Sequence, residues 1–252
     1  VVMNESAQDT FLSHLFELRD RLIRVLVVFI VLFFGSYLWP TWPVLYALFA
    51  KPLMAALPVG GQMISTDVVG VFLVPMKIAA LASFLVMLPY VLYQAWAFIA
   101  PGLYQHEKKF VLPLVFSSTL LFFVGMAFAY FLIFPTVFKF MASFAPEGVA
   151  WMTDIEKYFG FALSMFLVFG ITFETPVVVV LLVRMGFVTV DKLKDIRPYV
   201  FVGAFIIGAI FTPPDVLSQF LLAVPLYILY EAGIYFAQLF VRLKAPEDAA
   251  IQ

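Results

Sequence analysis

The stretch from Phe110 to Phe138 reads FVLPLVFSSTLLFFVGMAFAYFLIFPTVF and contains no charged residue and no histidine. About 20 mostly apolar residues in a helix cross the roughly 30 Å of hydrocarbon in a membrane, so this stretch predicts a transmembrane helix. The sequence therefore predicts an all-α integral membrane protein with six transmembrane helices in a single membrane domain, residues 1–252. The six predicted spans are 22–42, 78–105, 110–138, 158–183, 198–214 and 216–241.

The composition leaves no room for a separate soluble domain, because 64% of the 252 residues are hydrophobic and only 12% are charged. The sequence contains no cysteine, which excludes disulfides and thiol catalysis, and its two histidines, His14 and His106, lie far apart in the chain. We therefore expect no metal, no cofactor and no catalytic residue. The net charge of -1 gives no reason to expect a nucleic-acid partner.

Lysine and arginine are concentrated on one side of the predicted spans. With a cytoplasmic N-terminus, eleven of them lie on cytoplasmic segments and four lie on the opposite side. Positive residues accumulate on the cytoplasmic side of membrane proteins, so both termini are predicted to be cytoplasmic. On the outer side, segments 43–71 and 139–157 are long enough to form a cap.

The fifth predicted span is short, since residues 198–214 at 1.5 Å per residue extend about 25 Å. Either its neighbours shield a short helix, or the membrane beside it is locally thinned, and both interpretations stay open. Prolines in or at the edges of the other spans predict kinked helices that form a concave bundle. These prolines are Pro89, Pro113, Pro135, Pro176 and Pro225.

Glu174 is the strongest candidate for an intramembrane site, because it lies well inside the fourth predicted span. A charge at that depth costs at least about 2.5–3.5 kcal/mol, so protonation or a polar partner is expected. One interpretation is structural, a protonated carboxyl that bonds a neighbouring helix. The other is functional, a proton-linked step or contact with a partner helix. Gln94, Tyr130 and Gln219 are weaker polar candidates inside the spans.

Two of the carboxylates on segments predicted to face the cytoplasm, Glu17 and Glu107, are candidates for binding a ligand. Residues 13–22, SHLFELRDRL, have the apolar spacing of an amphipathic helix that leads into the first span. Within it Glu17 and Arg21 are four residues apart, so they can simply pair with each other. Glu107 follows the second span, and together with Glu17 it can hold two cationic groups such as guanidinium forks.

Two other classes of protein fit parts of the pattern. A secondary transporter for a small solute would explain Glu174 and the prolines, but the two halves of the chain show no convincing repeat. An intramembrane enzyme would need a nucleophile with its base or a metal set. The sequence has no Gly-x-Ser-x-Gly, no His-Glu-x-x-His and no phosphate-binding loop.

Short motifs are spread along nearly the whole chain. They are HLFELRDRL at 14–22, LPYVLYQAWAFIAPGLY at 88–104 with its continuation to Glu107, GMAFAYF at 125–131, FETP at 173–176, RPY at 197–199 and TPPD at 212–215. Each motif is weak alone, but the combination is specific. In this combination the chain resembles TatC, the multispanning receptor subunit of the twin-arginine protein translocase.

The resemblance implies a receptor in the cytoplasmic (inner) membrane of a prokaryote that receives folded proteins through their twin-arginine signal peptides. It implies that Glu17 and Glu107 bind the paired arginines, while Arg19, Pro52 and Phe98 shape or support that region. Transport would then be driven by the proton motive force rather than by nucleotide hydrolysis.

The resemblance also implies intramembrane contacts and partners. Glu174, together with Gln94 and Tyr130, would belong to a polar groove that contacts partner or signal-peptide helices, and Asp215 would lie at the outer turn. The partners would be single-span proteins of the TatA and TatB type, docked near the fifth and sixth spans. The receptor complex would be an oligomer surrounded by membrane lipid.

Overall fold

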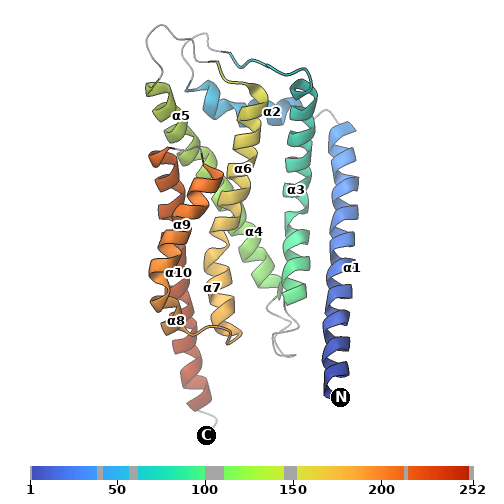
Figure 1. Ribbon diagram of the computed structural model, residues 1–252, viewed down its shortest axis with the longest axis vertical. Helices are drawn as coiled ribbons and strands as arrows, with labels where there is room; N and C mark the ends of the chain where they lie inside the picture. The colour runs from blue at the N-terminus through green and yellow to red at the C-terminus, as the bar shows by residue number, and fades with distance from the viewer. Residues whose placement is uncertain are drawn as a thin grey trace. The chain divides into compact units, whose positions relative to one another are not determined.

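The computed structural model describes residues 2–38, 42–56, 62–99, 111–144, 152–212 and 215–249. Within these ranges the prediction of an all-α protein is confirmed, and extended backbone pairs only at an isolated bridge between Ile64 and Asp154. The elements are α1 (Val2–Leu38), α2 (Trp42–Met54), α3 (Gly70–Ile99), α4 (Val111–Phe128), the π-helical turn η3 (Ala129–Ile133), α5 (Phe134–Ser143), α6 (Ile155–Phe173), α7 (Thr175–Arg184), α8 (Val190–Asp195), α9 (Arg197–Phe211) and α10 (Val216–Ala249) (Figure 1).

Four described segments are long and apolar enough to cross a membrane: Gly70–Ile99, Val111–Ser143, Ile155–Arg184 and Val216–Leu239. They correspond to the second, third, fourth and sixth predicted spans. A shorter apolar helix, Arg197–Phe211, corresponds to the fifth. Its 15 residues extend about 22 Å, so the fifth apolar helix is indeed shorter than a typical bilayer core.

Prolines mark two places where the helical geometry changes. Pro135 stands in the first turn of α5, directly after η3, and Pro176 stands in the first turn of α7, directly after α6 ends. A proline lacks a backbone N–H and fits the first turn of a helix, where that N–H has no partner in any case. Pro89 and Pro225, by contrast, lie inside the continuous helices α3 and α10.

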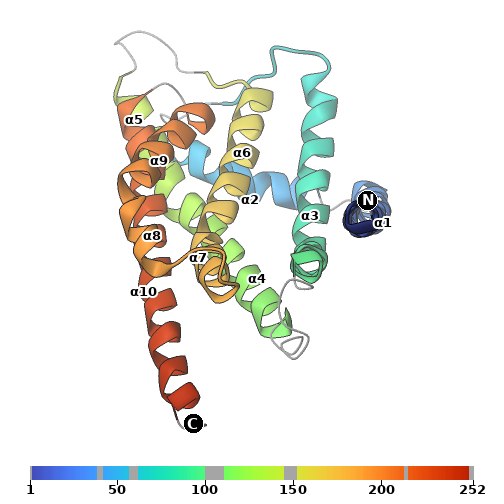
Figure 2. The same ribbon diagram turned by 60° about the horizontal axis from the view of Figure 1, so that its bottom comes forward.

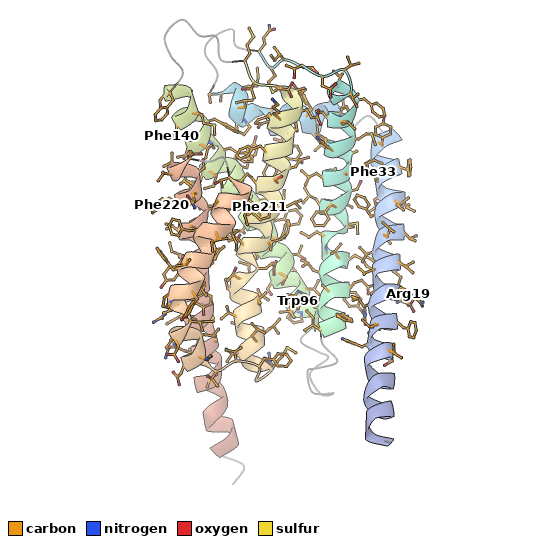
Figure 3. The ribbon with its side chains drawn as sticks, viewed as in Figure 1. Arg19, Phe33, Trp96, Phe140, Phe211 and Phe220 are labelled. Atoms are coloured by element: carbon orange, nitrogen blue, oxygen red, sulfur yellow. The ribbon has the colours of Figure 1, made fainter. Side chains whose placement is uncertain are left out.

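The chain forms two compact units, the first made of Val1–Tyr46 with Pro75–Thr119 and the second of Ala47–Val74 with Leu120–Gln252. In the first unit, polar side chains join neighbouring helices. The hydroxyl of Ser83 on α3 donates to the hydroxyl of Ser36 on α1 at 3.1 Å. Trp96 on α3 donates from Nε1 to the hydroxyl of Ser118 on α4, also at 3.1 Å (Figure 3).

The second unit contains an aromatic core. Phe134, Phe159, Phe166 and Phe169 are fully buried. The ring of Phe166 on α6 lies 5.3 Å from that of Phe49 on α2 and 5.0 Å from that of Phe134 on α5, measured between centroids. Tilted and edge-on aromatic pairs at such distances pack favourably beyond their burial alone. Part of the phenylalanine-rich composition therefore serves the packing between helices.

Helix α10 runs alongside α9 and α7 in the same unit, as the second view shows (Figure 2). A buried cluster joins Val179 of α7, Leu193 of α8, and Tyr230 and Ile234 of α10. The Tyr230 hydroxyl donates to the carbonyl oxygen of Leu193 at 2.8 Å, which ties the short α8 to α10.

The two segments predicted to form an outer cap meet at Asp154, which begins α6. Its Oδ1 accepts the backbone N–H groups of Glu156 and Lys157, and its Oδ2 accepts the hydroxyl and the N–H of Thr66. These hydrogen bonds hold the pKa of Asp154 below its usual range, and the bond from the Thr66 hydroxyl has the largest effect. One carboxylate thus caps a helix and fixes the loop that precedes α3.

Candidate functional site

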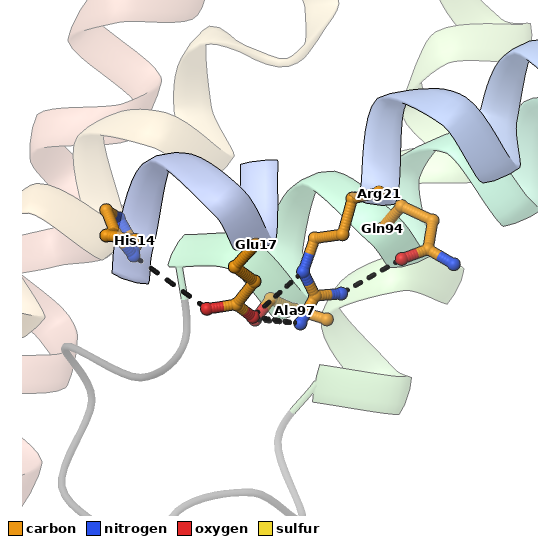
Figure 4. Close-up of polar contacts among 5 residues, drawn as sticks. All are labelled: His14, Glu17, Arg21, Gln94 and Ala97. Carbon is orange, nitrogen blue, oxygen red and sulfur yellow. Dashed lines mark hydrogen bonds and ion pairs between the residues drawn. The ribbon is translucent and has the colours of Figure 1, made fainter. Parts of the chain in front are cut away.

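The N-terminal part of α1 carries the first predicted binding residue. Residues 14–22 contain no glycine or proline, and three leucines, two arginines and one glutamate among them favour a helix. The helix places Glu17 one turn before Arg21, and their side chains pair. Arg21 donates to Glu17 Oε1 from Nη2 at 2.6 Å and from Nε at 3.0 Å (Figure 4). The pairing that the sequence left open is therefore present.

Arg21 also bonds the C-terminal end of α3. Its Nη1 donates to Gln94 Oε1 at 2.9 Å, and its Nη2 donates to the carbonyl oxygen of Ala97 at 3.3 Å. The last carbonyls of a helix have no partner within the helix, and the negative end of its dipole favours a cation. Gln94, predicted as an intramembrane polar residue, is buried with 7% exposure and serves to hold this guanidinium.

An aromatic pair lies beside the carboxylate. The imidazole of His14 stacks on the ring of Phe98 of α3 with 4.2 Å between centroids and 14° between planes. His14 Nδ1 lies 3.8 Å from Glu17 Oε2, which is too long for a hydrogen bond. The structure therefore brings together three of the predicted residues, Glu17, Phe98 and Gln94, at one end of the α1 and α3 pair.

Arg19 does not contact Glu17. Its guanidinium donates to Asp20 Oδ1 at 2.8 Å and lies 5.2 Å from the ring centroid of Phe16. The side chain is 61% exposed and extends from α1 (Figure 3). The second predicted carboxylate, Glu107, lies outside the described residues, as does the loop that carries it.

The remaining predicted residues belong to the second unit. Glu174 lies between the end of α6 and the start of α7 and is 8% exposed. Its backbone continues the helical hydrogen bonds, because its N–H donates to Ile171 and its carbonyl accepts from Val178, each at 3.0 Å. Glu174 thus lies within the long apolar segment Ile155–Arg184, which corresponds to the fourth predicted span.

Tyr130 and Pro52 act on the same helix turn. Proline has no N–H to donate, so Pro52 leaves the carbonyl of Leu48, four residues earlier on α2, without its helical donor. The Tyr130 hydroxyl, presented by the π-helical turn η3, donates to this oxygen at 2.8 Å. Tyr158 on α6 donates to the next carbonyl, that of Phe49, at 2.5 Å. Pro52 thus frees a carbonyl of α2, and Tyr130 bonds that carbonyl and holds α2 in place.

We expect Tyr130→Phe to lower the free energy of unfolding by about 0.5–1.5 kcal/mol, since it removes the one hydrogen bond that replaces the missing helical donor of the Leu48 carbonyl. In a Pro52→Ala background the restored backbone N–H can reach Leu48, so the same change should then cost less. Thermal unfolding in detergent measures both values. Tyr235→Phe is the matched control, because the Tyr235 side chain is 66% exposed. An equal loss in both backgrounds would contradict this role for Tyr130.

Asp215 caps the start of α10. Its Oδ1 accepts the N–H of Ser218 at 2.7 Å. One turn further along α10, Gln219 donates from Nε2 to the carbonyl oxygen of Phe205 on α9 at 2.9 Å. This hydrogen bond joins α10 to α9. Asp215 therefore lies directly before the start of α10, four residues after α9 ends at Phe211.

An ion pair that the sequence analysis did not single out joins α9 to α10. Arg197 Nη2 donates to Glu231 Oε2 at 2.6 Å, and the two side chains are 41% and 32% exposed. A signal was available, since the two opposite charges lie at nearly equal distances along the sequence from the motif at 212–215, 15 residues before it and 16 after it. Their separation of 34 positions hid the contact.

These observations first define a class, a helical membrane protein in which several long apolar helices are tied together by scattered polar contacts. The described residues contain no group of three or more metal-ligating side chains. Residues 13–225 match the family described as Sec-independent protein translocase protein (TatC).

Relatives and solved structures of this family cover almost the whole chain. The TatC protein of Azotobacter chroococcum mcd 1 is 49% identical over 251 residues, which are 98% of this chain and 95% of the relative. That of Escherichia coli (strain K12) is 47% identical over 238 residues, 94% of this chain and 92% of the relative. A crystal structure of the twin-arginine translocase receptor TatC superimposes with a TM-score of 0.80 at 35% identity, covering 90% of this chain and 98% of that chain.

The chain belongs to the TatC family. It is a component of the Sec-independent protein translocase and the receptor of twin-arginine translocation, and it is a transport protein rather than an enzyme.

Proposed function

We propose that this chain binds the twin-arginine signal peptides of folded cargo at the cytoplasmic end of α1, with Glu17 and Glu107 as the acceptors of the two arginines. The observation that carries the proposal is the Glu17 carboxylate, which Arg21 fixes through Oε1 while the side chain keeps 37% exposure. A fixed, exposed carboxylate beside an aromatic surface suits a planar guanidinium.

In this proposal Phe98 forms part of the surface that the arginine side chain contacts, because it lies under His14 next to the carboxylate. Arg19 shapes the rim from the exposed side of α1. Pro52 supports the receptor indirectly by shaping α2, since it frees the carbonyl that Tyr130 bonds.

We further propose that both units form one membrane domain with six spans and both termini in the cytoplasm of a prokaryote, in its inner membrane. The four long apolar segments supply four spans, and α1 and the short α9 supply the other two. The excess of lysine and arginine on one side supports the orientation. The restarts of the helix at Pro135 and Pro176 support kinked spans around a concave surface.

The proposed partners are single-span proteins of the TatA and TatB type, which would dock beside α9 and α10 in an oligomeric receptor complex. Glu174 would face a partner or signal-peptide helix from its position at the α6–α7 junction. Gln94 and Tyr130 would shape polar surface, each within its own unit, through the bonds they already make, and Asp215 would hold the outer turn. The proton motive force would drive transport.

Export from cells tests the proposal. Produced in bacteria that lack their own TatC, the chain should restore export of a folded reporter with an Arg-Arg signal peptide and not of the same reporter with Lys-Lys. An uncoupler that collapses the proton motive force should stop the export. Equal export of both reporters would contradict recognition of the arginines, and solute uptake into liposomes by the chain alone would favour a transporter instead.

A further inference from the structure

We propose that Arg21 is a positioning residue that makes the Glu17 carboxylate selective for arginine over lysine. This inference rests on the proposed function, because it concerns the same carboxylate. Glu17 already has a guanidinium partner within the chain, that of Arg21. This guanidinium donates to three acceptors, Glu17 on α1 and Gln94 and the Ala97 carbonyl on α3.

The contacts of Arg21 determine which carboxylate oxygen faces a ligand. Both of its bonds to Glu17, at 2.6 and 3.0 Å, end on Oε1. Among the described residues no donor bonds Oε2, which points toward His14 (Figure 4). Gln94 and the Ala97 carbonyl fix the guanidinium from α3. The carboxylate therefore cannot rotate freely, and its second oxygen is presented next to the stacked rings of His14 and Phe98.

The charge of Arg21 has a second consequence. Arg21 and Glu17 together are neutral, so a peptide cation gains little from general attraction to this pair. An ammonium group is a compact point charge and depends on that attraction. A guanidinium can still donate to Oε2 and place its flat face against an aromatic ring. His14 is 51% exposed, so its ring pair with Phe98 is accessible for such stacking.

Binding of labelled Arg-Arg and Lys-Lys signal peptides to the full chain in detergent tests this role. Arg21→Lys keeps the charge and loses the planar fork, so the Arg-Arg affinity should fall about tenfold while the Lys-Lys affinity changes less than about twofold. Gln94→Met removes one anchor of the guanidinium and should lower the Arg-Arg preference in the same direction, by about threefold.

Ser83→Ala is the matched control, because Ser83 also joins α3 to α1 but lies apart from the Glu17 contacts. It should leave the ratio of the two affinities unchanged. If Arg21→Lys weakens both peptides equally, or changes neither, Arg21 is only a structural tie and the inference is overturned. If Glu17→Ala leaves Arg-Arg binding intact, the proposed function itself fails, whatever Arg21 does.

Discussion

Replacing Gly125 by alanine is expected to destabilise the second unit by about 1–3 kcal/mol, or more if the helices cannot separate. A Cβ built on Gly125 would lie 2.5 Å from the backbone oxygen of Phe169 and 3.0 Å from the Cβ of Phe173. Neither atom is the end of a flexible side chain, so the backbone of α6 must move. Small residues permit such close approach of helices in membranes, where packing drives association.

Gly160→Ala on α6 is the control for this prediction. A Cβ there has nothing within 4 Å, and alanine favours a helix over glycine by up to about 1 kcal/mol. Thermal unfolding in detergent should therefore show a lowered midpoint for Gly125→Ala and an unchanged or raised midpoint for Gly160→Ala. Similar midpoints for the two variants would show that the α4–α6 contact is not as close as described.

Replacing Glu17 by alanine is expected to weaken binding of an Arg-Arg signal peptide at least tenfold. A charge-assisted hydrogen bond contributes about 1.5–3 kcal/mol, and each 1.4 kcal/mol is a factor of about ten in affinity. The change also leaves Arg21 without its anionic partner, which adds repulsion toward an incoming arginine. Glu107→Ala should weaken the same peptide if the second arginine binds there.

Asp20→Ala provides the control on the same helix. Asp20 is a carboxylate that is 50% exposed and bonds only its neighbour Arg19 among the described residues. Fluorescence anisotropy with a labelled peptide should show unchanged affinity for this variant. A comparable loss in Asp20→Ala and Glu17→Ala would mean that net charge, and not a defined site, attracts the peptide.

The four long apolar segments could be predicted from sequence because their physical cause is local. A run of about 20 uncharged residues in hydrocarbon satisfies its backbone hydrogen bonds within the segment as a helix. Such a run can be counted directly in the sequence. The short length of α9 follows from the same counting and is confirmed, whereas the burial of Glu174 among neighbouring helices depends on packing that counting does not reach.

Contacts between distant segments could not be predicted. The pairing of Arg21 with Glu17, one helical turn away, could be predicted. Its bond to Gln94, 73 positions away in the sequence, could not. Tyr130 was predicted as a groove residue, but its hydroxyl reaches Leu48, 82 positions earlier, because η3 and Pro52 together create the geometry. Neither a π-helical turn nor a freed carbonyl leaves a periodic signal in the sequence.

The family motifs gain a physical meaning from these contacts. In GMAFAYF, Gly125 permits close packing on α6 and Tyr130 bonds α2. In FETP, Pro176 restarts the helix after Glu174. In HLFELRDRL, His14, Glu17 and Arg21 meet beside α3. Sequence similarity could identify these residues together, but only the three-dimensional contacts separate those that support the fold from those that are available to a ligand.

The most direct test of the receptor account is the affinity of the unaltered chain for Arg-Arg and Lys-Lys signal peptides, measured by titration at low and high salt. Screening weakens general attraction far more than a short, directional contact. A receptor that recognises the arginines should show a preference of about tenfold or more for Arg-Arg that persists at high salt. Equal affinities that fall together as salt rises would contradict it, because Glu17 would then be an ordinary surface charge.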